Sequence, residues 1–187
     1  MHQRIFIAIN LPEKIKKELK KFQEKWPTLP VRWVKPENLH ITLAFLGYIS
    51  PEELAEVFKV TNEIAKKHNL FFINLKKTIY GPPKKFPPKM VWLEIESNKE
   101  LVSLKKDLEN SLSKKINYSP ENRLFSPHIT LGRIKSWDFR KIELEERPQI
   151  EEEVNLGFEV KSIEIMESQL KKGGAEYATL ESCQLKN

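Results

Sequence analysis

The sequence is poor in cysteine and has no long apolar run, and each shortage excludes a class of protein. A single cysteine, Cys183, stands among the 187 residues, so neither an intrachain disulfide nor a cysteine-based zinc site can form. Its ordinary role, in "LESCQL", is that of a small buried thiol. No apolar stretch approaches the roughly 18 residues that a membrane-spanning helix needs. We therefore expect a protein that does not cross a membrane.

Three further signals are missing. The N-terminal segment 1–18 has a short apolar run with strand-like alternation and no small-residue cleavage site, which argues against a secretory signal peptide and for a cytoplasmic protein. No G-x-S-x-G occurs, so a serine-hydrolase nucleophile elbow is absent. The Gly-rich turns of a nucleotide-binding parallel sheet are absent too.

The charge is unbalanced towards the positive. Lys and Arg number 32 against 26 Asp and Glu, which gives a net charge of +6. Such a surface favours polyanions such as RNA through counterion release. Lysine-rich surfaces also serve as ion-pair networks in thermophile proteins, so the charge alone does not identify a partner. The hydrophobic fraction of 40% is enough for a packed core, and the length suits one domain, residues 1–187, made of two lobes.

Strands are predicted at residues 4–10, 71–80, 89–96, 125–132, 158–169 and 175–185, the last two joined by a "KKGG" turn. A short extended piece is expected at 31–34, and a helix or irregular segment at 136–153. Helices should begin at Pro12, at the capping-box sequence "SPEE" (50–53) and after Asn98. Their apolar stripes are Ile15, Leu19, Phe22 and Trp26; Leu54, Val57, Phe58, Ile64 and Ala65; and Leu101, Leu104, Leu108 and Leu112. This order favours an α+β fold with mostly antiparallel strands.

The four letters H-I-T-L occur twice, at 40–43 and at 128–131. Side chains alternate between the two faces of a strand, so His40 and Thr42 share one face, as do His128 and Thr130. The opposite face of the first copy, suited to a core, carries Leu39, Ile41, Leu43 and Phe45. Each half of the chain holds one such strand, a helix and a pair of further strands, a weak repeat that two pseudo-symmetric lobes would explain.

Two imidazoles and two hydroxyls in one cleft suit phosphoester chemistry without a metal. Histidine, with a pKa near 6.5, can give or take a proton at neutral pH, and each such transfer contributes roughly 10²–10⁴-fold. Threonine hydroxyls can donate hydrogen bonds to phosphate oxygens, and Arg133 is a candidate to clamp the anion. A single H-x-T in a strand is uninformative, but two copies with the same flanking pattern are not. A zinc site would need a third ligand, which neither motif supplies.

The chain resembles the two-histidine (2H) phosphoesterases, specifically the RNA 2′,3′-cyclic phosphodiesterases, also known as 2′-5′ RNA ligases. The paired "HITL" motifs match the H-x-T-x pair that defines the family. The flanking segments "RIFIAINLP", "VRWVKPENLHITLAFLG", "FPPKMVWLEI", "SPHITLGR" and "QLKKGGAEYATL" are similar to family segments and extend the likeness over nearly the whole chain. The resemblance implies a bilobal fold, with two pseudo-symmetric, mostly antiparallel sheets flanked by helices around a central cleft.

The resemblance also implies an activity, namely hydrolysis of RNA 2′,3′-cyclic phosphate to a 2′-phosphomonoester with no metal or cofactor. Carried over, His40 is the proton donor, His128 is the proton acceptor, and Thr42 and Thr130 hold the phosphate oxygens. Ligation to a 2′-5′ linkage would follow if a 5′-hydroxyl replaced water. From the residues alone the division into acid and base stays open, because the two motifs look alike.

Aromatic side chains are candidates for stacking on a base or ribose; the alternative for each is that it packs in the core. Phe45, Phe86 and Tyr177 are the main candidates, beside Trp33 and Trp92. Phe86 lies in the loop "GPPKKFPP", whose four prolines and two lysines predict a stiff, basic, exposed segment; Lys84 and Lys85 there could meet RNA phosphates.

The expected partner is RNA with 2′,3′-cyclic phosphate ends, tRNA fragments included, or a small cyclic nucleotide, and a monomer suffices. The alternative from another class is a non-catalytic module that binds RNA ends with the same fold.

Overall fold

The computed structural model describes residues 2–122, 124–171 and 174–187. Its strands are β1 (Gln3–Asn10), β2 (Val31–Trp33), β3 (His40–Ile49), β4 (Phe71–Gly81), β5 (Met90–Ile95), β6 (His128–Ile134), β7 (Gly157–Val160), β8 (Ser162–Lys171) and β9 (Gly174–Gln184). Its helices are α1 (Glu13–Glu24), α2 (Pro51–Ala65), α3 (Lys99–Leu112) and α4 (Ser136–Arg140), with short 3₁₀ turns η1 (Pro36–Asn38) and η2 (Leu144–Glu146). No described helix is long and apolar enough to cross a membrane.

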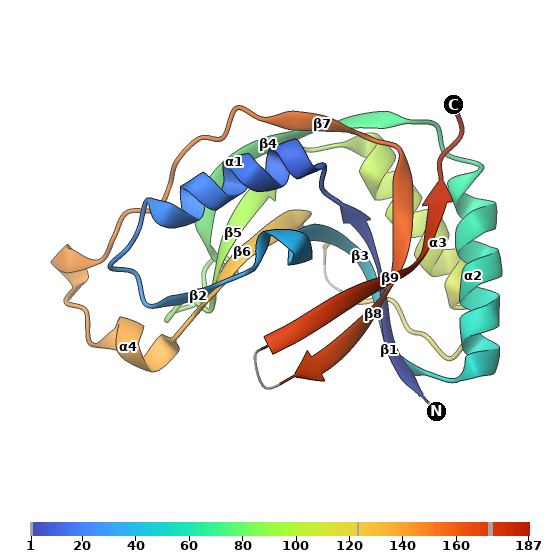
Figure 1. Ribbon diagram of the computed structural model, residues 1–187, viewed down its shortest axis with the longest axis horizontal. Helices are drawn as coiled ribbons and strands as arrows, with labels where there is room; N and C mark the ends of the chain where they lie inside the picture. Colours follow the sequence, from blue (N-terminus) through green and yellow to red (C-terminus); the bar gives the residue numbers. More distant parts are fainter. Residues whose placement is uncertain (1, 123, 172–173) are drawn as a thin grey trace.

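The strands form a curled sheet in the order β7-β4-β5-β6-β3-β1-β8-β9, with β2 added on β6 (Figure 1). All of these strand pairs are antiparallel. The order divides into two sets of four that meet where β6 lies beside β3, at the single pair Ile41 and Ile129. Each set has its motif strand at this junction. The predicted α+β fold with mostly antiparallel strands is confirmed, but the two predicted sheets are joined at this junction into one.

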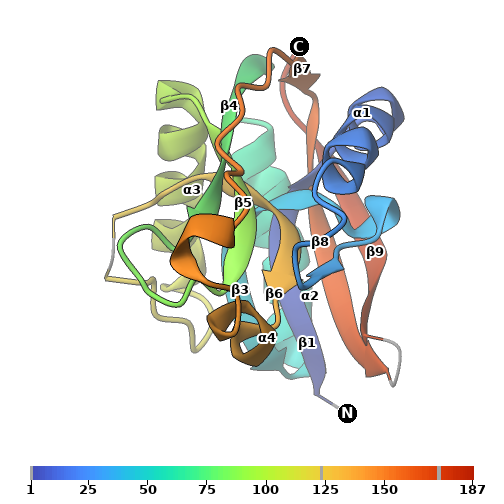
Figure 2. The same cartoon turned by 90° about the vertical axis from the view of Figure 1, so that its left-hand side faces the viewer.

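The spatial halves are not the two halves of the sequence. The set that contains β3 is completed by β1 from the N-terminal end and by β8 and β9 from the C-terminal end. The strands β4 and β5, which follow the first motif along the chain, pair instead with the second motif strand β6. The β8–β9 hairpin stands beside β1 (Figure 2). The first motif is therefore positioned by both ends of the chain.

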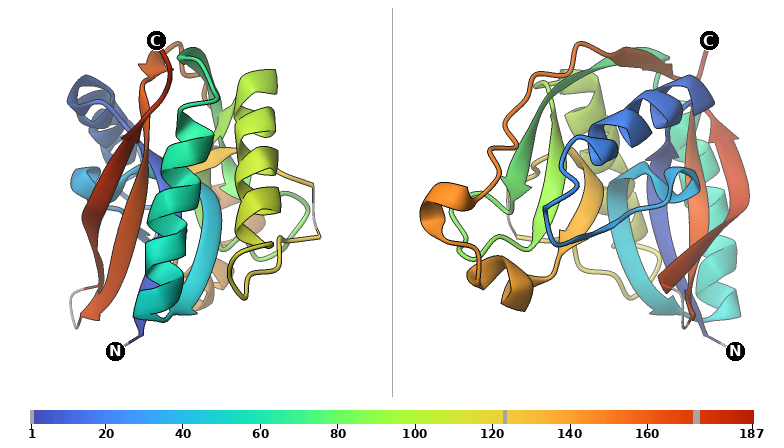
Figure 3. Two further views of the ribbon diagram at one scale, coloured as in Figure 1. Left: turned by 90° about the vertical axis from the view of Figure 1, so that its right-hand side faces the viewer. Right: turned by 60° about the vertical axis from the view of Figure 1, so that its left-hand side comes forward.

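The two helices that follow "SPEE" and Asn98 begin where the sequence predicts. The Ser50 hydroxyl accepts the Glu53 N–H at 3.2 Å and the Glu53 carboxylate accepts the Ser50 N–H at 2.9 Å, a complete capping box. The Asn98 side chain accepts the Leu101 N–H at 2.7 Å. Helices α2 and α3 lie side by side (Figure 3), and the four predicted leucines of α3 are fully buried.

Helix α1 connects to the second motif through a buried polar side chain. The apolar stripe predicted a helix as far as Trp26, but α1 ends at Glu24. Within its last turn Gln23 is buried, and its amide donates to the carbonyl oxygens of Val34 at 2.8 Å and Leu131 at 3.0 Å. Both carbonyls are thereby satisfied away from water, and α1 is held against the strand that carries His128.

One predicted strand is wrong. The run 158–169 is divided at Lys161 into β7, which pairs with β4, and β8, which pairs with β1 and β9 at the other end of the sheet. The apolar positions change phase at the break, from Phe158 and Val160 to Ile163 and Ile165, so the sequence marks the break but not the pairing partners of the two pieces. The segment 136–153 contains the short α4 and η2 and is otherwise mainly irregular, as predicted. Residues 172–173 of the expected "KKGG" turn lie outside the described residues.

Candidate active site

The two H-I-T-L motifs meet at the junction of the two sets of strands. Ile41 and Ile129 pair directly and are fully buried. His40 and Thr42 flank this pair on β3, and His128 and Thr130 flank it on β6. All four polar side chains line one cavity of about 610 Å³. The predicted gathering of two imidazoles and two hydroxyls is present in the structure.

A β-bulge after each motif determines which of the next side chains on the strand faces this cavity. Beside β1, the partner of Ala8 is Thr42, that of Ile7 is Ala44 and that of Phe6 is Phe45, so the register shifts within β3. The extra residue reverses the alternation of faces. Ala44 is consequently 3% exposed in the core, while Phe45 is 47% exposed and lines the cavity. The prediction that Phe45 faces the core was therefore wrong, although its candidacy as a base contact fits this position.

The second motif strand has the same irregularity. Trp92 pairs with Thr130, whereas Val91 pairs with Gly132, which leaves Leu131 as the extra residue. Arg133 thereby joins Thr130 on the cavity side. Strict alternation would have directed Arg133 into the core, so the bulge is what makes it available to an anion. Arg133 and Phe45 occupy equivalent places, three residues after the threonine of their motifs.

A second guanidinium reaches the cavity because β2 packs directly on Gly132. A Cβ atom on this glycine would lie 2.3 Å from Cγ1 of Val31 and 2.8 Å from Cε3 of Trp33. The missing side chain permits this close approach. In the resulting ladder Arg32 is the direct partner of Arg133, and both line the cavity. Two like charges placed opposite each other repel, and a bound anion would relieve that repulsion.

The cavity is strongly basic. Arg4 from β1 and Lys171 from the end of β8 complete a set of four cations with Arg32 and Arg133, and no Asp or Glu is among the described lining residues. The guanidinium carbon of Arg4 lies 4.9 Å from the centre of the Phe45 ring. Of these four, only Arg133 is a candidate from the sequence; Arg4, Arg32 and Lys171 are not. The alternation in β1 sets Arg4 opposite the buried isoleucines, but which face forms the cleft depends on pairing.

Both catalytic candidates are held in the same tautomer by a carbonyl two residues earlier. Nδ1 of His40 lies 2.7 Å from the Asn38 carbonyl oxygen, and Nδ1 of His128 lies 2.8 Å from that of Ser126. A carbonyl oxygen can only accept, so Nδ1 carries the hydrogen in each ring. Proton gain and loss then occur at Nε2. The Asn38 amide also donates to the Ala175 carbonyl at 3.0 Å, which ties this turn to β9.

The surroundings of the two rings differ. His40 lies 5.0 Å from the Phe6 ring and 5.3 Å from the edge-on Tyr177 ring, and its Nε2 is 3.1 Å from the Thr42 hydroxyl oxygen. Burial lowers the pKa of His40 below the usual 6.5, against the opposing effect of the Asn38 hydrogen bond, and the nearby His128 lowers it further.

A tryptophan supports the second histidine. The rings of Trp92 and His128 stack at 3.7 Å and 19°. Gly81 lies behind the indole, where a Cβ atom would come within 2.4 Å of Trp92 Cδ2. Trp92, a candidate base contact, thus has a role in holding His128.

The remaining aromatic candidates divide between the cavity and other surfaces. Tyr177 lines the cavity. Phe86 is 67% exposed and lies in a separate pocket together with Lys84 and Lys85, with the Arg147 guanidinium 4.9 Å from its ring. Trp33 is half-buried on Gly132 and stacks on Trp26 at 6.3 Å, so it packs rather than faces the cleft.

Comparison with known proteins agrees with this geometry. The profile of the "LigT like Phosphoesterase" family matches the chain twice, over residues 9–92 and 93–177, once for each motif. The chain belongs to the LigT-like phosphoesterase family. The predicted resemblance to the 2H phosphoesterases is thereby confirmed, and so is the weak repeat of the sequence.

Relatives cover the whole chain. An RNA 2′,3′-cyclic phosphodiesterase of Methanocaldococcus jannaschii is 34% identical over 95% of this chain and 98% of its own. One of Thermotoga maritima is 32% identical over 97% of this chain and 95% of its own. Among solved structures, Escherichia coli LigT in complex with 3′-AMP superposes with a TM-score of 0.82, at 26% identity and with full coverage of both chains.

Proposed function

We propose that the protein hydrolyses RNA 2′,3′-cyclic phosphate ends to 2′-phosphomonoesters, with His40 as general acid and His128 as general base and without a metal ion. The observation that carries the proposal is the pair of imidazoles with Nδ1 held by carbonyls in a cavity with four cations. The names of the curated relatives and the 3′-AMP complex of LigT support the substrate class.

The cyclic phosphate binds with its non-bridging oxygens facing Thr42, Thr130 and Arg133. Nε2 of His128 takes a proton from water as the water oxygen attacks phosphorus. The bond from phosphorus to the 3′ oxygen breaks, and Nε2 of His40 gives its proton to that oxygen. The Asn38 and Ser126 carbonyls accept from Nδ1 and stabilise each ring in its charged form. A 5′-hydroxyl in place of water would yield a 2′-5′ linkage by the same proton transfers.

We propose metal independence on the chemistry of the two imidazoles. Two imidazoles that already divide the proton transfers need no metal-activated water. Among the described residues no group of three or more His, Cys, Asp and Glu side chains is placed to hold a metal ion.

The test is hydrolysis of adenosine 2′,3′-cyclic phosphate in EDTA. We expect turnover by the intact protein, a 2′-phosphate product, and losses of about 10²–10⁴-fold in His40→Ala and His128→Ala. Undiminished activity in both variants would refute the mechanism, and a 3′-phosphate product would reverse the leaving group. Binding of RNA ends without turnover by the intact protein would favour the non-catalytic alternative.

We also propose that the chain is a single two-lobed domain, that the protein acts as a monomer in the cytoplasm, and that tRNA fragments are among its substrates.

A further inference from the structure

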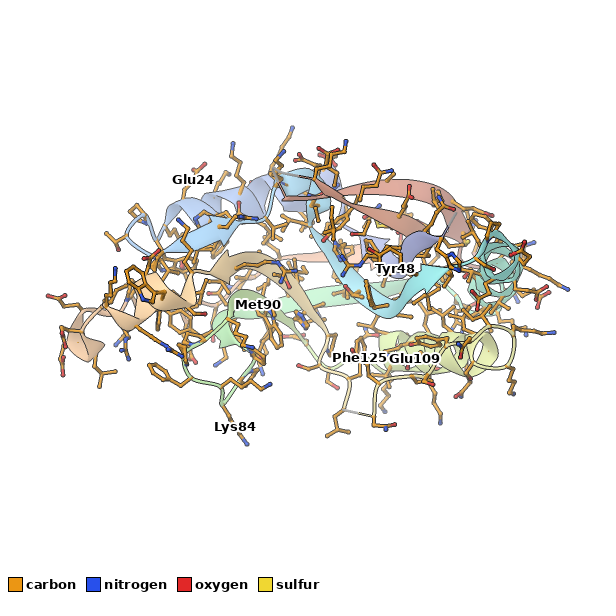
Figure 4. The ribbon with its side chains drawn as sticks, turned by 90° about the horizontal axis from the view of Figure 1, so that it is seen from below. Glu24, Tyr48, Lys84, Met90, Glu109 and Phe125 are labelled. Carbon is orange, nitrogen blue, oxygen red and sulfur yellow. The ribbon has the colours of Figure 1, made fainter. Side chains whose placement is uncertain are left out.

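A second cavity, of about 320 Å³, adjoins the basic cavity on the other side of His128. The two cavities share three lining residues, Thr42, Phe45 and His128. The other walls of the second cavity come from β5, α3 and the loops around residues 82 and 118–126. Figure 4 shows Glu109 of α3 and Phe125 of the following loop next to each other on this side of the molecule.

The second cavity is lined mainly by aromatic side chains, whereas the first is lined by cations. Its walls include the rings of Phe45, Trp92, Tyr118 and Phe125 and the prolines Pro82 and Pro83. Its one described cation, Lys105, forms an ion pair with Glu109 and lies 5.0 Å from the Phe125 ring centre. Two carboxylates, Glu109 and Glu121, line it. A mainly aromatic cavity whose described lysine is already paired suits a flat, uncharged ring better than a phosphate.

The polar wall of this cavity is ordered before any ligand binds. The Tyr118 hydroxyl donates to Oε1 of Glu109 at 2.8 Å. The side chains of Lys105 and Glu109 are only 14% and 13% exposed. Because these three groups fix one another, the cavity does not have to be organised at the moment of binding.

A nucleotide carries a charged phosphate and a flat, uncharged base on one ribose. In a nucleoside 2′,3′-cyclic phosphate the phosphate and the base leave the same sugar ring, so a phosphate held between the two histidines places the base in a neighbouring cavity. The volume is at the lower end of the about 300–1,000 Å³ of small-ligand sites. In the basic cavity, the three cations other than Arg133, namely Arg4, Arg32 and Lys171, are available for the phosphates of the preceding nucleotides.

We propose that the second cavity binds the base of the terminal nucleotide, and that the basic cavity carries the phosphodiesters that precede it. The inference rests on the proposed function, because it assumes that the cyclic phosphate lies between His40 and His128. It assigns the direction of the RNA chain across the site. It also gives Phe45, at the border of both cavities, a place beside the ribose.

The experiment compares ratios of kcat/KM. The substrates are adenosine 2′,3′-cyclic phosphate, a methyl riboside 2′,3′-cyclic phosphate that lacks a base, and a dinucleotide that ends in adenosine 2′,3′-cyclic phosphate. Phe125→Ala should reduce the preference for adenosine over the base-less substrate by about tenfold, since stacking on an aromatic ring contributes that much or more. Phe125→Leu, which keeps an apolar side chain there, should reduce it by less.

Two control variants separate the cavities. Phe72→Ala removes an exposed ring of β4 that lies outside both cavities, and it should leave the preference for a base unchanged. Arg32→Ala should reduce the advantage of the dinucleotide over the mononucleotide without changing the preference for a base. An unchanged preference in both Phe125 variants, or its loss in Arg32→Ala, would overturn the assignment.

Failure of the proposed function has a different signature. If no cyclic phosphate is hydrolysed by the intact protein, the same ratio is measured as dissociation constants for adenosine 2′-monophosphate and ribose 2-phosphate by calorimetry. A tenfold preference for the nucleotide that Phe125→Ala removes would still support the base site. Equal affinities in the intact protein would overturn it.

Discussion

His40 and His128 are chemically identical residues in the same tautomer, and their neighbours make them different. His40 is enclosed by Phe6 and Tyr177, whereas His128 is stacked on Trp92. Desolvation disfavours the charged ring at His40. Once protonated there, the imidazolium is a stronger acid than free histidine, which suits a group that must give up its proton to a departing alkoxide.

The division into acid and base can be tested with the leaving group. A phosphodiester that expels 4-nitrophenolate needs little protonation of the leaving oxygen, so His40→Gln should retain most of its activity on that substrate. His128→Gln should lose activity on both substrates, since the water still needs a base. Relative rates on the nitrophenyl ester and on adenosine 2′,3′-cyclic phosphate measure the difference. Equal losses in the two variants on the nitrophenyl ester would contradict the assignment.

The pH dependence of kcat/KM should reflect the lowered pKa of His40. An acid must be protonated to act, and the pKa of His40 lies below 6.5 in the free protein because the ring is desolvated. The reactive fraction therefore decreases as pH rises through a value below 6.5. A pH series with adenosine 2′,3′-cyclic phosphate should show its basic limb in that range. In the Tyr177→Ala variant, which admits water to the His40 ring, the basic limb should move to higher pH.

At the scale of the strands, the bulges and close packing around the motifs decide what surrounds the histidines. The same register shift in β3 and β6 moves Phe45 and Arg133 onto the cavity side. The approach of β2 to Gly132 adds Arg32. The two motifs thus share a backbone device and differ in what it presents, an aromatic ring in one and a guanidinium in the other.

Gly132→Ala tests the close packing of β2. The added methyl group would overlap Val31 and Trp33, so we expect the free energy of unfolding to fall by about 1–3 kcal/mol, as measured by denaturant titration. The double variant Val31→Ala/Gly132→Ala should lose less than the sum of the two single variants, because removal of Cγ1 relieves part of the overlap. Strict additivity would show that the contact with Val31 is not the cause.

At the scale of the whole molecule, the cations of the cavity come from segments that are far apart in the chain. Arg4 and Lys171 belong to the set of strands around β3, whereas Arg133 belongs to the set around β6. The junction of the two sets therefore concentrates the positive charge of a chain whose net charge is only +6. That arrangement favours a chain of phosphates over a single one.

Added salt should consequently weaken the binding of long substrates more than that of short ones. We expect KM to rise more steeply with salt for an oligonucleotide with a 2′,3′-cyclic end than for the mononucleotide, by a logarithmic slope of about 0.7 for each additional neutralised phosphate. Lys171→Ala should reduce the slope for the oligonucleotide and leave that of the mononucleotide nearly unchanged. Parallel salt dependences for the two substrates would show that the basic cavity does not bind the preceding phosphates.

Short-range patterns in the sequence were sufficient for much of the fold and for the centre of the site. The two H-I-T-L strands, the capping box at Ser50 and the leucine stripe of α3 depend on neighbours within a few residues, and the structure places all of them as expected. The pairing of His40, Thr42, His128 and Thr130 in one cavity followed from alternation in two strands that turned out to be adjacent.

The other residues of the cavity were decided by tertiary structure, because their placement depends on which strands pair and in what register. A bulge arises between two partners and leaves no mark in the residues of either one, so alternation alone predicts Phe45 in the core and does not show how Arg133 reaches the cavity. A change of apolar phase after Val160 marks the division of 158–169, but the partners of its two pieces, β4 for β7 and β1 and β9 for β8, were decided by the tertiary structure. By itself the sequence determined the two H-I-T-L motifs whose histidines are proposed to react, whereas the structure decided the four cations and the aromatic cavity that surround them, because these depend on strand pairing.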